Sequence, residues 1–176
     1  RFQRISVSDA WLDTLGFCPI ASNTFQALAE AAKARNLRFS DDHGCYDTLF
    51  HQLFLNYVEP ELGKTTPAFV WGWPASQAAL AKLNPEDPRV ALRFELYAGG
   101  LELANAFDEL TDPHEQRRRF KAEQSERASN GSPVFPLDEE LLNGLSEIPP
   151  TSGIALGVDR LVMLLLNAKS ISEVRL

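Results

Sequence analysis

Two glutamates in the middle of the sequence, Glu95 and Glu102, are spaced so that they could share a metal ion. They flank Gly99-Gly100 within residues 89–109, where a two-residue glycine turn predicts two antiparallel strands. In such a pair, Glu95 and Glu102 lie diagonally on one face, about 7 Å apart at the backbone. Because neighbouring carboxylates repel, a divalent cation that carries phosphates is a natural partner for them.

The other residues of this hairpin divide between two faces. Simple alternation places Ala104 and Ala106 beside the two glutamates, where small side chains leave room for a flat adenine or aminoacyl group. Tyr97 and Asp108 join that face, and the opposite, apolar face collects Phe94, Leu96, Ala98, Leu101, Leu103 and Phe107. The alternative interpretation of the polar face is a solvated strand surface.

Asn105 and Glu109 do not fit the apolar face on which alternation puts them. Burying an amide or a carboxylate without partners costs several kcal/mol. We therefore expect a β-bulge near Asn105 that turns Asn105 or Glu109 toward a ligand. Ordinary alternation continuing through Phe107 would contradict this hypothesis.

A second candidate segment is the glycine-containing stretch from Gly153 to Arg160, read as a small-residue strand that enters a helix. Glycines there allow a backbone or a ligand to approach closely. Arg160 lies in the first turn of the helix, where the helix dipole opposes a cation, so an anion must compensate. The phosphates of a nucleotide could supply it. A salt bridge to Asp159 is the structural alternative.

The remaining elements support these two segments. We predict helices from Ser8 to Leu15, Asn23 to Asn36 and Tyr46 to Tyr57. Their polar residues do not form a set that converges on one site, so we interpret these helices as scaffold. A strand at Ala68 to Trp73, helices at Asp112 to Asn130 and Asp138 to Leu145, a strand at Gly153 to Leu156 and a buried helix after it complete the pattern. The fold class is α+β, an antiparallel sheet flanked by helices.

Composition limits the function further. The 176 residues fit one domain, and an apolar content of 44% is typical of a soluble globular protein. A net charge of -7 argues against a broad nucleic-acid surface. The longest apolar run, Leu161 to Leu166, is far shorter than the ~20 residues of a membrane span. Without a signal peptide, we expect a cytoplasmic protein with reduced thiols at Cys18 and Cys45.

The two candidate segments resemble the class II lysyl-tRNA synthetases. That family has a strand pair before its third motif that is similar to "RFELYAGGLELANAFDELTDPHEQRRRF", and a third motif similar to "GIALGVDRLVMLLLNAKSISEV". The stand-alone ligases of the family, which attach β-lysine to elongation factor P, also resemble "WPASQAALAKLNPEDPRVALRFELY", chiefly in Pro74-Ala75-Ser76-Gln77. The resemblance is close from about Val58 to the C-terminus and loose over the first third.

The resemblance implies a role for each matching residue. Glu95 and Glu102 match the acidic pair that holds magnesium against ATP, and Glu102 with Leu103 matches an ATP contact. Asn105 and Glu109 match residues that receive the amino acid, Glu109 by pairing with an ammonium group. Gly157 and Arg160 match nucleotide contacts of the third motif. Arg160 and Glu102 would then be the catalytic residues, with ATP and magnesium as cofactors.

The implied reaction is activation of lysine or β-lysine as an adenylate, followed by transfer to a lysine of elongation factor P. The alternatives are the catalytic half of a lysyl-tRNA synthetase, whose acceptor is tRNA, and a non-catalytic interaction module. Ala106 replaces the family's usual glycine, and no segment resembles the first two motifs. We therefore expect residues 1–176 to form the C-terminal half of a class II catalytic domain, inactive alone. Residues 1–60 would be a helical segment and residues 61–176 the core; a homodimer is expected for the full-length protein.

Overall fold

The fold centres on the hairpin at Gly99-Gly100. In the computed structural model, which describes residues 1–40 and 44–175, both glycines have positive φ, 60° and 76°. Only glycine adopts two successive left-handed conformations without a large steric cost, and such turns match the twist of paired strands. The turn joins β3 (Arg93–Ala98) to β4 (Leu101–Asp108), as the sequence predicted.

These two strands are the middle of a five-stranded sheet with the order β1-β2-β3-β4-β5. The outer strands are β1 (Gln3–Ser6), β2 (Ala68–Trp71) and β5 (Ser152–Leu156). All neighbours are antiparallel except β1 and β2, which are parallel. The α+β class is thus confirmed, with a mostly antiparallel sheet. The strand β1 was not among the elements expected from the sequence.

Pairing between β3 and β4 shifts by one residue between Leu96 and Tyr97. Near the turn Tyr97 pairs with Glu102, but beyond the shift Leu96 pairs with Ala104, so Leu103 has no partner in the register. The expected break in alternation is therefore confirmed, two residues before Asn105. The extra residue moves Asn105 to the face that carries Glu95, because each strand residue alternates sides.

The same bulge corrects several face assignments. Glu95 and Glu102 share a face as predicted, but Ala104, Ala106 and Asp108 lie on the opposite one. One face carries the paired row Val70, Glu95, Asn105 and Ala155; the other carries the paired row Trp71, Phe94, Ala106 and Ile154. The two alanines therefore cannot make room beside the glutamates. The alternation rule failed because it counts residues and cannot detect an inserted one.

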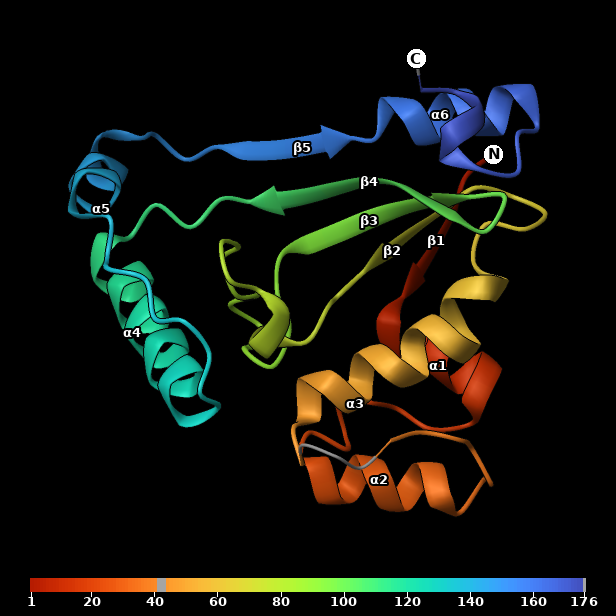
Figure 1. Cartoon of the computed structure of the whole chain (residues 1–176), viewed down its shortest axis with the longest axis horizontal. Coiled ribbons are helices and arrows are strands. Elements are labelled where there is room, and N and C mark those ends of the chain that lie inside the picture. The colour runs from red at the N-terminus through yellow and green to blue at the C-terminus, as the bar shows by residue number, and fades with distance from the viewer. Residues whose placement is uncertain (41–43, 176) are drawn as a thin grey trace.

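Three N-terminal helices pack on the face that carries Glu95, below the sheet in Figure 1. They are α1 (Val7–Leu15), α2 (Phe25–Lys33) and α3 (Tyr46–Leu53). A π-helical turn (Phe54–Val58) and a 3-10 turn (Glu59–Glu61) extend α3. Trp11 stacks on Phe50 with ring centroids 4.9 Å apart, and Trp73 and Tyr97 reach this core from the sheet side. The scaffold prediction agrees with this packing.

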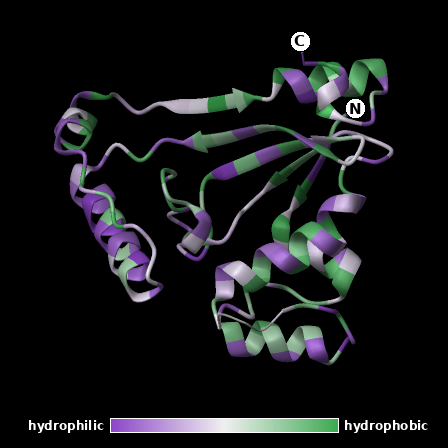
Figure 2. Cartoon of the chain, viewed as in Figure 1, coloured by the Kyte–Doolittle hydropathy of each residue, from purple (hydrophilic) through white to green (hydrophobic). Residues whose placement is uncertain are grey.

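The helices α4 (Pro113–Ser129) and α5 (Glu139–Gly144) lie together at one end of the sheet (Figure 1). Asp112 caps α4 by accepting hydrogen bonds from the backbone of His114 and Glu115, as its position before Pro113 suggested. Figure 2 shows α4 mostly in purple, the hydrophilic colour. Arg119 of α4 donates to the carbonyls of Ala78 and Ala81, which anchors the segment after β2.

The last helix, α6 (Val158–Leu166), follows β5 and lies at the opposite end of the sheet from α5 (Figure 1). Its Leu164 touches the hairpin turn at Gly99. We predicted a buried helix, and this is wrong: only Met163 is buried, whereas Leu165 is 74% exposed. The described part of the chain provides too few apolar neighbours to cover the apolar side chains of α6.

Two further sequence expectations concern the same described residues. No helix among them is both long and apolar enough to cross a membrane. Cys18 and Cys45 are not joined by a disulfide in this structure, and their reduced state stays a prediction.

A glycine pair tests how tightly the hairpin packs. Gly63 and Gly131 both have φ of +66°, but a Cβ at Gly63 would lie 2.6 Å from the backbone of Tyr97, whereas nothing lies within 4 Å at Gly131. We expect Gly131→Ala to lower the free energy of unfolding by about 1 kcal/mol, the left-handed cost alone. Gly63→Ala should lower it by at least about 3 kcal/mol, because backbone must also move. Urea denaturation measures both, and equal losses would contradict the close approach.

Candidate active site

Five of the residues singled out from the sequence line one hollow of about 580 Å³ between β4, β5 and the start of α6. They are Glu102, Leu103, Asn105, Gly157 and Arg160. Ala155, which pairs with Asn105 across the sheet, lines it too. Two segments about 50 residues apart in the sequence therefore meet at a single cavity because β5 pairs with β4.

Arg160 reaches the hollow from the first turn of α6. Gly157 fixes the strand-to-helix junction by donating its N–H to the carbonyl of Leu103, at 2.8 Å. The Arg160 Nη1 donates to the Glu102 carbonyl at 2.9 Å and to Glu102 Oε2 at 3.0 Å. Asp159 instead accepts from Arg175, so the structural alternative of an Asp159–Arg160 salt bridge is wrong.

The Arg160–Glu102 pair is open to solvent, with side chains 48% and 29% exposed. An ion pair in such a setting contributes about 1 kcal/mol or less, because water screens the charges. Its members can therefore exchange partners at little cost. Arg160 can take an anion such as a phosphate, and Glu102 can take a cation.

Glu95 has a different environment. Its side chain is 5% exposed, and its two oxygens accept from three donors: Arg93 Nη2 and Asn105 Nδ2 at Oε1, and Tyr97 Oη at Oε2. Burial raises the pKa of Glu95, and the Arg93 charge and the Tyr97 hydrogen bond oppose that rise. Tyr97 is itself buried, and burial together with the Glu95 charge raises its pKa. Hydrogen bonds from within the protein therefore hold the side chains of Glu95 and Tyr97 in place.

The two glutamates therefore differ in their fit to magnesium. Glu102 offers a partly exposed carboxylate at the hollow, which suits a hard cation that also binds phosphate oxygens. Glu95 does not fit, because protein donors already occupy three of its four lone-pair positions and almost no surface remains. Within residues 1–40 and 44–175, no group of three or more His, Cys, Asp or Glu side chains could hold a metal ion by itself.

Glu109 lies apart from the hollow that holds Arg160. It lines a second hollow of about 240 Å³ with apolar neighbours that include Leu80, Leu110 and Phe120. Its carboxylate lies against Gly153, where an added Cβ would be 2.3 Å from Oε1. Within the described part of the chain, the side-chain carboxylate of Glu109 accepts no hydrogen bond. A half-buried carboxylate without a partner is suited to receive a cationic group.

Sequence reasoning gave no role to four residues around this site. Arg93 and Tyr97 donate hydrogen bonds to Glu95, and the Arg93 guanidinium lies over the Trp73 ring. Burial and the nearby Glu102 charge both raise the pKa of the fourth residue, Glu59. The spacing of Arg93, Glu95 and Tyr97 at every second residue was a usable signal, since it places all three on one face. Glu59 carried no such signal.

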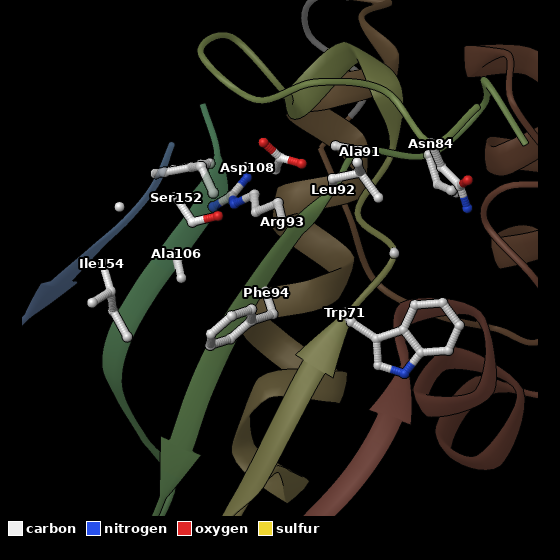
Figure 3. Close-up of a pocket in the computed structure, with 14 residues that line it drawn as sticks. Trp71, Asn84, Ala91, Leu92, Arg93, Phe94, Ala106, Asp108, Ser152 and Ile154 are labelled. Carbon is white, nitrogen blue, oxygen red and sulfur yellow. The ribbon is translucent and has the colours of Figure 1, made fainter. Parts of the chain in front are cut away.

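A third hollow, of about 520 Å³, lies on the other face of the sheet. Figure 3 shows Trp71, Phe94, Ala106 and Ile154 pointing into it from neighbouring strands. None of the residues predicted to bind ATP, magnesium or the amino acid lines it. Its lining is mostly apolar, and its two charged residues already have partners, Arg93 with Glu95 and Asp108 with Lys82. We therefore do not assign the chemistry to it.

The sequence is similar to known proteins over almost its whole length. The sequence model of the family described as tRNA synthetases class II (D, K and N) matches residues 2–176. The elongation factor P–(R)-β-lysine ligase of Klebsiella pneumoniae subsp. pneumoniae is 46% identical over 173 residues, which is 98% of this chain and 53% of the relative. The ligases of that name from Salmonella typhi and Erwinia tasmaniensis are 45% and 47% identical over the same shares. The chain thus spans about half the length of these curated relatives.

The contrast between the two glutamates predicts different losses of stability. In Glu95→Gln the buried Arg93 loses its counter-ion, so we expect the free energy of unfolding to fall by about 3 kcal/mol. Glu102→Gln, the matched control on the same face, should lose about 1 kcal/mol or less because its pair is exposed. Urea denaturation of both variants measures the difference. A larger loss for Glu102→Gln would show that Glu95 is not the structural member of the pair.

Proposed function

Because the chain belongs to the class II tRNA synthetases of the D, K and N group, we propose that its protein activates (R)-β-lysine or lysine with ATP and transfers it to a lysine of elongation factor P. One observation carries the proposal: Glu102, Asn105, Gly157 and Arg160 converge on a single hollow from two distant segments. The names of the relatives support the acceptor. Residues 1–176 would be the C-terminal half of the catalytic domain.

The proposed reaction has two steps. In the first, a carboxylate oxygen of the amino acid forms a bond to the α-phosphorus of ATP, the bond from that phosphorus to the β-bridging oxygen breaks, and pyrophosphate leaves. In the second, the acceptor amine attacks the carbonyl carbon of the adenylate, AMP leaves and the amine loses a proton. No covalent bond to the enzyme forms, so positioning and charge neutralisation provide the catalysis.

In the first step Arg160 would leave Glu102 and bind phosphate oxygens, where its guanidinium offers paired donors. Glu102 would then be free to hold magnesium. When bound with ATP, magnesium neutralises phosphate charge as the negative charge moves toward pyrophosphate. Gly157 would keep the strand-to-helix junction close to the nucleotide, since it has no side chain to fill the hollow.

The amino acid would lie along β4. Asn105 and Glu109 are on the same face of this strand, about 13 Å apart at the backbone, with Asn105 in the first hollow and Glu109 in the second. An amino acid whose reactive carboxylate lies near Asn105 could reach Glu109 only with a long side chain that ends in a cation. Lysine and β-lysine have that shape, which supports a lysine-like substrate.

The rival functions differ in the acceptor and in turnover. A lysyl-tRNA synthetase half would serve tRNA, and a non-catalytic module would not use ATP. The net charge of -7 favours a protein acceptor over RNA, since phosphate neutralisation needs clustered cations. The cytoplasmic location and the homodimer expected from the resemblance stay predictions.

ATP–pyrophosphate exchange by the full-length gene product tests the proposal. We expect exchange with (R)-β-lysine or lysine, and transfer of the labelled amino acid to elongation factor P in preference to tRNA. Arg160→Met should lower the exchange rate roughly 10²–10³-fold, because a donor to the reacting phosphate is lost. Arg127→Met, which removes an exposed arginine paired with Glu123 on α4, is the control and should leave the rate unchanged.

Exchange with neither amino acid would favour the non-catalytic module. Exchange followed by transfer to tRNA would favour the synthetase.

A further inference from the structure

Arg93 is a buried cation at the site to which neither the sequence nor the proposed reaction gave a role. Its side chain is 14% exposed, and its guanidinium lies 4.5 Å from the ring centroid of Trp73. The guanidinium donates to Glu95 Oε1, to Asn105 Oδ1 at 3.2 Å and to the carbonyl of Gln77 at 2.9 Å. It therefore connects β3, β4 and the segment after β2.

We propose that Arg93 is a positioning residue that fixes the side-chain amide of Asn105 with one N–H directed at the substrate. The inference rests on the proposed function, and it explains how this chain orients a residue that contacts the amino acid. Arg93 itself does not line the hollow that contains Asn105. Its effect on the reaction is therefore exerted through Asn105.

Charge alone determines the orientation of the amide. A guanidinium can only donate, so the side of Asn105 that faces Arg93 must be the carbonyl oxygen. An ionised carboxylate can only accept, so the side that faces Glu95 must be the NH₂ group, whose nitrogen is 3.1 Å from Oε1. The two neighbours impose the same orientation, and rotating the amide by 180° would break both bonds.

One amide proton of Asn105 is thereby left over. It makes no hydrogen bond within residues 1–40 and 44–175, and Asn105 lines the hollow at Glu102 and Arg160. Asn105 can thus donate to an oxygen of the substrate, and a carboxylate is the best acceptor among the groups of an amino acid. In the rotated orientation it would present its own oxygen and repel that carboxylate.

Several contacts keep Arg93 rigid enough for this role. The Trp73 ring on one side and the Phe107 ring, with its centroid 5.6 Å away, restrict the guanidinium, and cation–π attraction stabilises it there. Its bond to the Gln77 carbonyl also ties it to the Pro74-Ala75-Ser76-Gln77 segment. A lysine at this position could keep the charge, but it could not direct separate donors at three acceptors in fixed geometry.

The test uses Arg93→Lys and Arg93→Met in the full-length gene product, with Arg89→Met as the matched control. Arg89 is an exposed arginine four residues earlier, and within the described residues its side chain hydrogen-bonds to Asp87 alone. Exchange kinetics should show KM for the amino acid raised roughly tenfold to a hundredfold in both Arg93 variants, with KM for ATP changed less than about twofold. Arg93→Lys keeps the counter-ion of Glu95, so its thermal midpoint should stay near that of the wild type.

A second readout does not depend on turnover. The side-chain amide protons of Asn105, assigned in NMR spectra by their loss in Asn105→Ser, should exchange slowly with solvent in the wild type. We expect their exchange to be at least about tenfold faster in Arg93→Lys, and unchanged in Arg89→Met.

The results separate the two proposals. A wild-type protein without ATP–pyrophosphate exchange activity would overturn the proposed function. Hydrogen exchange at the side-chain amide of Asn105 would still decide the role of Arg93. Arg93→Lys with unchanged KM for the amino acid, or with Asn105 protons as protected as in the wild type, would overturn the positioning role. Loss of stability in Arg93→Met with wild-type KM values in the folded protein would show that Arg93 is only structural.

Discussion

The buried carboxylate of Glu95 is the constraint on which the site depends. An ionised group with 5% of its side chain exposed is tolerated only when donors replace the lost water, and Arg93, Asn105 and Tyr97 supply them. Each donor comes from a strand, and Tyr97 also packs into the core beneath the N-terminal helices. The packing of those helices is therefore coupled to the orientation of a side chain at the candidate active site.

The bulge at Leu103 makes this network possible. Without the unpaired residue, Asn105 would face the opposite side of the sheet and Glu95 would lose a donor. Bulges commonly re-aim side chains next to functional sites, and here the consequence is a polar row, Glu95 and Asn105, continued by the small Ala155. The cost of an interrupted ladder is local, whereas the change of face applies to the whole remainder of β4.

The candidate site combines rigid and exchangeable interactions. The network around Glu95 is buried and made of charge-assisted hydrogen bonds, so it can define geometry. The Arg160–Glu102 pair is exposed and weak, so both groups can transfer to ligands. This difference separates two glutamates that the resemblance to the lysyl-tRNA synthetases treats as one metal-binding pair.

The sequence by itself determined the local features of this protein. Two consecutive glycines require a turn, Asp112 before Pro113 starts a helix, and Asn105 in an apolar pattern requires a break in alternation, because each follows from short-range sterics or from the cost of an unpaired polar group. The resemblance singled out five residues that line the hollow, and also Glu95 and Glu109, which do not line it. Only the tertiary structure decided where the bulge lies, which glutamate is buried, and that Arg160 pairs with Glu102 and not with Asp159. Those outcomes depend on how strands and helices far apart in the chain pack together, and residue spacing within one segment does not contain that information.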